Sequence, residues 1–175
     1  MTMNFLYLDV LPLRSAEEVG GFTREATRQR GLALAITWDE RNRFRAFTAQ
    51  QHNELIGVMN EAQCIVGYNC RAFDFEILQY EPPVSCDLFT EISEAAKQSV
   101  PLRRVYRDLG TRPILSDTNR LTTRWRAGKR SEVITAFSRH VGAIRRLHQH
   151  ILQHGWILYE SWEGEIKRAQ ISLTR

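Results

Sequence analysis

The chain has 175 residues, of which 43% are hydrophobic and 25% charged, a composition typical of a soluble globular protein. No apolar run approaches the ~18 residues that a membrane span requires, and the first residues do not resemble a signal peptide. The three cysteines lack metal-ligand spacing and are expected to be reduced thiols. We therefore expect a cytoplasmic protein without membrane association, in which residues 1–175 form a single domain.

The net charge of +4 conceals a strong asymmetry along the chain. Residues 1–100 carry 9 basic and 14 acidic side chains, whereas residues 101–175 carry 15 basic and 6 acidic ones. The excess is concentrated between Pro101 and Leu147 and consists almost entirely of arginine, whose planar fork suits phosphate and carboxylate groups. This block could attract a nucleic acid backbone or an acidic protein, and the alternative is a solvated helical face.

Short apolar runs predict four strands in the first half of the chain. Residues 5–10 are typical of a buried central strand, residues 32–38 and 43–48 flank a polar turn as in an antiparallel hairpin, and residues 64–68 form a further run. Residues 15–22 contain a glycine pair and predict a loop or a short helix.

Helical periodicity dominates the rest of the chain. Thr48 is a plausible N-cap for a helix over residues 50–62, and a second helix is predicted over residues 73–80, before a proline pair. Further helices are predicted over residues 88–98, 102–109 and 116–124. The most regular apolar spacing runs from Ser131 to Gly155, and two strand-like runs after it predict a terminal hairpin.

Two of the predicted strands lead to carboxylates, Asp9 and Asp74. The segments Tyr7-Leu8-Asp9, Val66-Gly67-Tyr68-Asn69 with Phe73-Asp74, and Cys86-Asp87-Leu88 occur in an order and spacing that resemble the DEDD superfamily of 3′–5′ exonucleases. The resemblance covers roughly residues 5–172. It implies an α/β fold, namely an RNase H-like mixed β-sheet of about five strands flanked by helices, with a C-terminal hairpin.

The same resemblance implies a site in which half of the acids are replaced. Members of this family hold two divalent ions with four carboxylates, the first two of which are separated by one residue on a strand. Here that pair is Asp9 and Leu11, and on the late helix Val141 aligns with the family's last Asp and Phe137 with the Tyr of one subclass. Only Asp9 and Asp74 remain as residual catalytic and metal-binding positions.

We therefore expect a catalytically degenerate exonuclease-like domain, retained for nucleic-acid binding or as a scaffold in a nucleic-acid-processing assembly such as a helicase or polymerase complex. No cofactor is expected in that case. One alternative is an active nuclease with a reduced site around Asp9 and Asp74, which would require Mg²⁺ or Mn²⁺. The other is a protein-interaction module whose arginine-rich face meets an acidic partner.

The candidate nucleic-acid-binding surface lies in the arginine-rich block and includes one tryptophan that could stack on a base. Core packing is the competing interpretation for that tryptophan. The candidate residues are Arg103, Arg104, Arg107, Arg124, Trp125, Arg126, Lys129 and Arg130.

Three other polar features have simpler interpretations. His140 is interpreted as a solvent-facing helical residue, with a role as a substitute base as the alternative. His150 and His154 have helical spacing but no third ligand type on their face. Asp87 precedes a helix and is interpreted as its cap.

Overall fold

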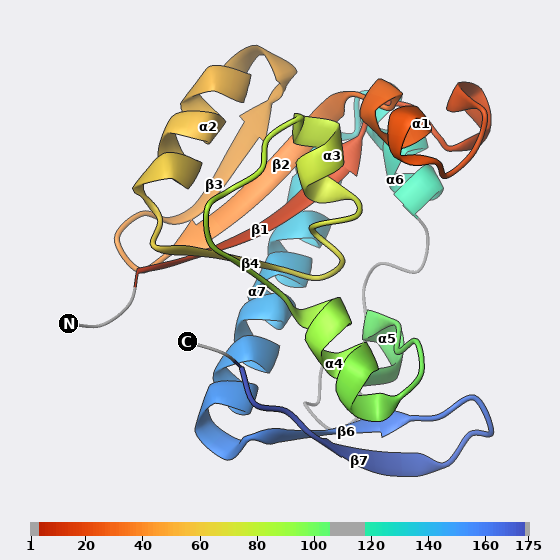
Figure 1. Ribbon diagram of the computed structural model, residues 1–175. Helices are drawn as coiled ribbons and strands as arrows, with labels where there is room; N and C mark the ends of the chain where they lie inside the picture. The colour runs from red at the N-terminus through yellow and green to blue at the C-terminus, as the bar shows by residue number, and fades with distance from the viewer. Residues whose placement is uncertain (1–3, 106–117, 174–175) are drawn as a thin grey trace.

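A five-stranded mixed sheet forms the centre of the computed structural model, which describes residues 4–105 and 118–173 (Figure 1). The strand order is β3-β2-β1-β4-β5; β1 pairs antiparallel with β2 and parallel with β4. The β2–β3 pair is antiparallel and the β4–β5 pair is parallel. The strands are β1 (Phe5–Pro12), β2 (Leu32–Asp39), β3 (Arg43–Thr48), β4 (Cys64–Gly67) and β5 (Ser85–Asp87). This confirms the predicted fold class.

Alternation along β1 divides the interior into two apolar clusters, one on each face of the sheet. Leu6, Leu8 and Val10 belong to one cluster, together with residues of α2 (His52–Glu61) and α3 (Asp74–Leu78). Tyr7 and Leu11 belong to the other cluster, which contains the apolar stripe of α7 (Arg130–His154). Because side chains alternate with a period of two, Asp9 shares the face of Tyr7 and Leu11 and is directed toward α7.

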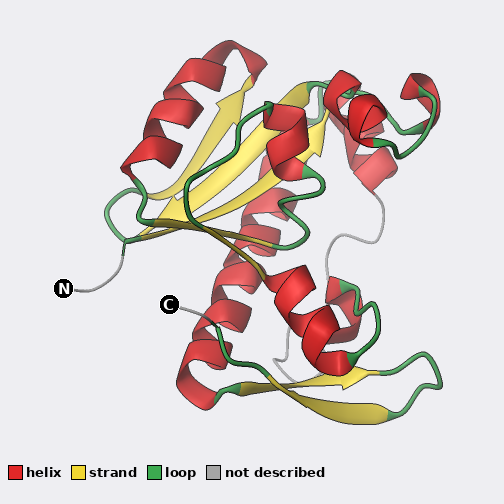
Figure 2. Cartoon of the chain, in the orientation of Figure 1, coloured by secondary structure: helices red, strands yellow, loops and turns green. Residues whose placement is uncertain are grey.

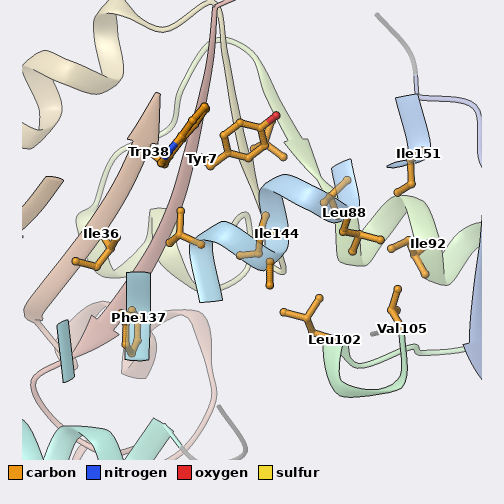
Figure 3. Packing of buried hydrophobic residues seen from close by; sticks show 14 of the residues in the cluster. Tyr7, Ile36, Trp38, Leu88, Ile92, Leu102, Val105, Phe137, Ile144 and Ile151 are labelled. Carbon is orange, nitrogen blue, oxygen red and sulfur yellow. The ribbon is translucent and has the colours of Figure 1, made fainter. Parts of the chain in front are cut away.

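Helix α7 is the longest element, with 25 residues and a length of about 37 Å. Phe137, Ile144 and Ile151 recur on its buried face. In Figure 3, Ile144 lies between the sheet residue Tyr7 and Leu88 of helix α4 (Leu88–Ala96), and Phe137 lies on the side of Ile36. Gly155 ends the helix at φ +71°, a left-handed conformation that glycine adopts without strain. No helix among the described residues is long and apolar enough to cross a membrane.

The C-terminal hairpin consists of β6 (Trp156–Glu160) and β7 (Ile166–Gln170), paired antiparallel as predicted. It lies at the far end of α7, beside α4 (Leu88–Ala96) and α5 (Leu102–Val105) (Figure 2). The predicted helix at 102–109 is described only as far as Val105, since residues 106–117 lie outside the described part.

The sequence did not indicate two short elements. Helix α1 (Arg24–Gln29) buries only Ala26 and Thr27, so it lacks an apolar stripe, and the Thr23 side chain caps it. Strand β5 has only three residues. Other boundaries moved by a few residues: η2 (Ala49–Gln51) precedes α2, η1 (Glu17–Val19) occupies the glycine-pair loop, and α6 covers Thr118–Arg126.

Candidate functional site

Asp9 lies in the middle of the central strand β1 and is 9% exposed. Its Oδ1 accepts a hydrogen bond from the backbone N–H of Val10 at 3.0 Å. Its Oδ2 accepts a hydrogen bond from Nδ1 of His140 at 2.5 Å, which requires the imidazole proton to be on Nδ1. Both oxygens of this carboxylate therefore have partners within the protein.

His140 reaches Asp9 from the middle of α7. Its side chain is only 15% exposed and its ring meets the edge of the Phe137 ring, with centroids 6.4 Å apart. The interpretation of His140 as a solvent-facing residue is therefore wrong. The sequence could not reveal this contact, because the rotation of α7 about its own axis relative to β1 is set by packing across the whole helix.

Asp74 begins helix α3 and is almost entirely buried, at 1% exposure. Its Oδ2 has no hydrogen-bond partner among the described residues. Burial raises the pKa of this carboxyl well above its usual range, the negative charges of Asp9 and Asp87 raise it further, and the N–H of Val10 acts in the opposite direction. Asp9 and Asp74 are thus close enough for the charge of one to act on the other.

Asp87 stabilises the turn between β4 and α3, which precedes Asp74. Its carboxylate accepts hydrogen bonds from the backbone N–H groups of Asn69, Arg71 and Phe89 at 2.8, 3.0 and 3.1 Å. The bond from Phe89 caps α4, which confirms the interpretation of Asp87 as a capping residue. With three backbone donors, this carboxylate fixes the backbone of the turn and of the first residues of α4.

The positions that the sequence resemblance aligns with two family acids and a tyrosine lie in the apolar interior. Leu11 and Val141 are 0% exposed and Phe137 is 2% exposed, and all three belong to the cluster between the sheet and α7. They offer no oxygen to a hard cation. No group of three or more His, Cys, Asp or Glu side chains within residues 4–105 and 118–173 is arranged to hold a metal ion.

The candidate nucleic-acid-binding residues are distributed between the two ends of α7. Arg104 lies at the hairpin end, where it donates to the backbone oxygen of Ser161 at 2.6 Å and stacks on the Trp162 ring at 3.8 Å. Arg103 is exposed on the same short helix α5. Arg107 falls outside the described residues.

The other candidates lie on or beside α6, near the start of α7. Arg124 pairs with Glu132, and Arg130 lies over the Trp125 ring, whose side chain is 8% exposed and part of the apolar cluster. Trp125 is therefore not presented for stacking on a base. Lys129 is exposed beside it.

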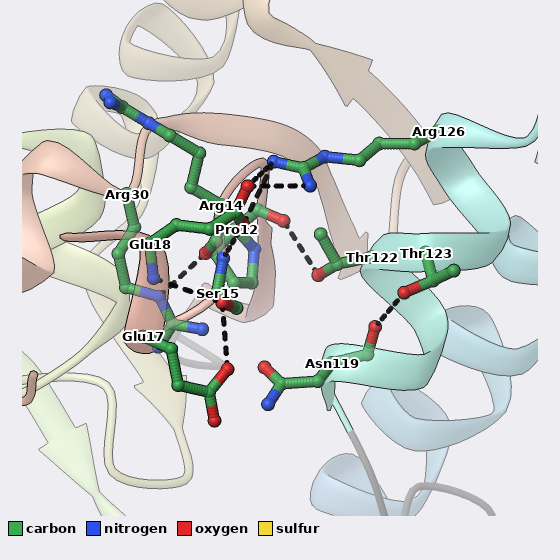
Figure 4. A network of polar contacts seen from close by, with 10 residues as sticks. All are labelled: Pro12, Arg14, Ser15, Glu17, Glu18, Arg30, Asn119, Thr122, Thr123 and Arg126. Atoms are coloured by element: carbon green, nitrogen blue, oxygen red, sulfur yellow. Dashed lines mark hydrogen bonds and ion pairs between the residues drawn. The ribbon is translucent and has the colours of Figure 1, made fainter.

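Arg126 connects α6 to the segment that follows β1. Its guanidinium holds both oxygens of Glu18 at 2.9–3.1 Å, and Thr122 donates from Oγ1 to the backbone oxygen of Pro12 at 3.0 Å (Figure 4). These bonds attach α6 to the end of β1. Arg126 thus has a structural contact in addition to its candidate role.

Comparison with known proteins supports the fold. No protein-family model and no curated protein sequence matches the chain. The structure is similar to that of a family B DNA polymerase from the hyperthermophilic archaeon Pyrobaculum calidifontis, with a TM-score of 0.66 and 14% sequence identity. The match covers 87% of this chain and 25% of the polymerase chain. At this identity the similarity shows a common fold and nothing further.

Proposed function

We propose that this chain is an exonuclease-like domain that binds nucleic acid without cutting it, as a binding or scaffold part of a nucleic-acid-processing assembly. The observation that carries the proposal is the contact between Asp9 and His140. In this arrangement the His140 imidazole is hydrogen-bonded to an oxygen of the Asp9 carboxylate, which exonucleases of the resembled family use to bind metal. The apolar residues Leu11 and Val141 support the same proposal because they complete a packed interior beside that contact.

The similarity to a quarter of a DNA polymerase chain supports the nucleic-acid part of the proposal. Exposed basic residues at the two ends of α7 supply cations for such contacts. Arg103, Lys129 and Arg130 are exposed, and cations on a surface attract the phosphate backbone at any sequence.

A cleavage assay tests the catalytic part of this proposal. The protein is incubated with single-stranded and duplex DNA and RNA, in Mg²⁺ and in Mn²⁺, and no shortening of the strands is expected. Cleavage that disappears in both Asp9→Ala and Asp74→Ala, but persists in the exposed control Glu61→Gln, would overturn the proposal.

A binding assay tests the nucleic-acid part. We expect affinity for labelled DNA or RNA to fall as salt rises, with a log–log slope of about −0.7 to −0.9 for each phosphate contact. The triple variant Arg103→Gln/Lys129→Gln/Arg130→Gln should make the slope shallower, while Arg41→Gln in the β2–β3 turn serves as the control. Absence of binding even at low salt would favour a surface for an acidic protein instead.

A second candidate function is a nuclease with a reduced site. The observation that favours it is Asp74, whose buried Oδ2 lacks a partner among the described residues and which lies beside Asp9. The cleavage assay separates this candidate from the first, because it requires divalent-ion-dependent cleavage that both acids support.

A further inference from the structure

A pocket of about 310 Å³ lies between helices α1 and α3, away from the arginine-rich block. We call it the arginine pocket; its charged and aromatic lining includes Arg24, Arg28, Arg71, Glu76, Tyr80 and Glu81. The volume falls at the lower end of the range for small-molecule sites, roughly 300–1,000 Å³. Nothing in the sequence indicated it, because its arginines come from a helix and a turn that are separate in the chain.

Two of the arginines are oriented by one carboxylate. Glu76 accepts a hydrogen bond from Nε of Arg24 at 2.7 Å and, through its other oxygen, from Nε of Arg28 at 2.8 Å. Arg24 and Arg28 are four residues apart on α1, so their side chains lie on the same face of the helix. Glu76 is thus a positioning residue: both of its oxygens are engaged and its side chain is only 11% exposed.

The geometry leaves donors available. The bonds to Glu76 come only from the Nε atoms, and among the described residues the terminal nitrogens of Arg24 and Arg28 donate no hydrogen bond. Arg71 is held separately, with Nη2 donating to the backbone oxygen of Ser85 at 2.7 Å and Nε donating to its Oγ at 3.2 Å. Three guanidinium groups therefore face one small pocket.

The charged residues that line the pocket favour an anion, and the volume of the pocket favours a small one. Three arginines oppose Glu76 and Glu81, so the lining carries a net charge of about +1, and Glu76 is already neutralised by its two partners. The hydrogen bonds from Arg24 and Arg28 hold the pKa of Glu76 below its usual value, which keeps this brace ionised near neutral pH. The guanidinium groups of Arg24 and Arg28 are planar, and their terminal N–H groups are spaced to donate to the oxygens of a phosphate group.

We infer that the arginine pocket binds a terminal phosphate group, carried either by a mononucleotide or by the end of a nucleic acid strand. Arg24 and Arg28 would supply the principal donors, Arg71 a third, and the half-buried Tyr80 an aromatic wall for an attached group. Only the strand-end form rests on the proposed function, since a mononucleotide could bind whether or not the protein binds nucleic acid.

The test uses the full chain and four probes: inorganic phosphate, AMP, and a labelled single-stranded oligonucleotide ending in either a phosphate or a hydroxyl group. Calorimetry is used for the first two probes and fluorescence anisotropy for the oligonucleotides. We expect AMP to bind and, if the strand end is the source, the phosphorylated strand to bind more tightly than its hydroxyl counterpart. Arg24→Gln and Arg28→Gln should each weaken binding by about tenfold, whereas Arg41→Gln should not.

Two carboxylate variants with the same charge change give opposite expectations. Glu81→Gln removes a negative charge from the lining and should tighten binding, whereas Glu76→Gln removes the brace of both arginines and should weaken it. Thermal unfolding of each variant verifies that it is folded. Tightening by both variants would mean that Glu76 contributes only charge, and would overturn its positioning role.

The inference is overturned if neither phosphate, AMP nor a phosphorylated strand end binds more tightly to the wild type than to Arg24→Gln/Arg28→Gln. Failure of the proposed function has a different signature. In that case AMP binds and the arginine variants weaken it, but neither oligonucleotide binds at low salt. The converse result would retain the proposed function and reject the pocket: neither phosphate nor AMP binds, and both oligonucleotides bind equally, and with the same salt dependence, to the wild type and the double variant.

Discussion

Asp9 and His140 are separated by 131 residues in the sequence, yet Oδ2 of the one and Nδ1 of the other are 2.5 Å apart. The contact joins the central strand β1 to the longest helix α7 at a point where both side chains are mostly buried. It is a fixed feature of the interior rather than an exposed ion pair, and its removal should be measurable as a loss of stability.

We expect His140→Ala to lower the free energy of unfolding by about 1–3 kcal/mol, because the buried carboxylate of Asp9 loses its charge-assisted partner. Urea unfolding measures the change, and Arg139→Ala, at the exposed neighbouring position, is the control. Equal stability of the wild type and His140→Ala would show that water replaces the imidazole without cost.

Stability should depend on the protonation of His148 on the same helix. His148 is 2% exposed, its Nδ1 is 3.0 Å from the Tyr7 hydroxyl, and burial lowers its pKa from 6.5 to about 4. The unfolded chain therefore binds more protons than the folded chain between these two pH values. Stability is fully present above pH ~6.5 and should decline by up to about 3 kcal/mol as the pH falls toward 4.

The variant His148→Gln keeps a hydrogen-bonding group for Tyr7 but cannot titrate. Its free energy of unfolding, measured in urea from neutral pH to pH ~4, should lack this decline even if it is lower at neutral pH. His154→Gln, at an exposed position, should retain the wild-type pH dependence. An unchanged pH dependence in His148→Gln would assign the decline to other groups.

Two glycine-to-alanine changes should have opposite effects. A Cβ on Gly67, at the end of β4, would lie 2.5 Å from the Cβ of Cys70 and 3.4 Å from the backbone oxygen of Leu8. Gly67→Ala should therefore destabilise the protein by about 1–3 kcal/mol and disturb the turn before Asp74. Thermal unfolding measures the effect.

Gly57→Ala is the matched comparison, because Gly57 lies in helix α2 and a Cβ there meets nothing within 4 Å. It should stabilise the protein by about 0.5–1 kcal/mol, since alanine favours the helical backbone. Destabilisation by both changes to the same extent would contradict the close approach at Gly67.

Two tryptophans should respond differently to truncation. Trp125 is buried in the main apolar cluster, so Trp125→Ala should cost about 3–5 kcal/mol of unfolding free energy. Trp162 is 55% exposed and contacts Arg104 by stacking, so Trp162→Ala should cost about 1 kcal/mol or less. Similar losses in the two variants, measured by urea unfolding, would contradict this assignment of core and surface.

Much of the fold followed from local patterns. The apolar runs located β1, β2, β3 and β4, and the regular spacing located α7 and its end at Gly155. The exceptions were α1 and β5, which are short and bury too few side chains to produce a periodic signal. Within β1, alternation alone determined that Asp9 and Leu11 face the same side of the sheet.

The candidate site is formed by residues far apart in the sequence, and local sequence patterns do not predict which of them come into contact. One step along a helix turns a side chain by about 100°, so the sequence could not decide whether His140 or Val141 faces Asp9. Packing of the whole α7 stripe against the sheet decided it. The same long-range packing buried Trp125, separated the arginines at the two ends of α7, and brought Arg24, Arg28 and Arg71 around one pocket. The sequence by itself determined which residues share a face of an element, because backbone geometry fixes that period; only the tertiary structure decided which faces meet.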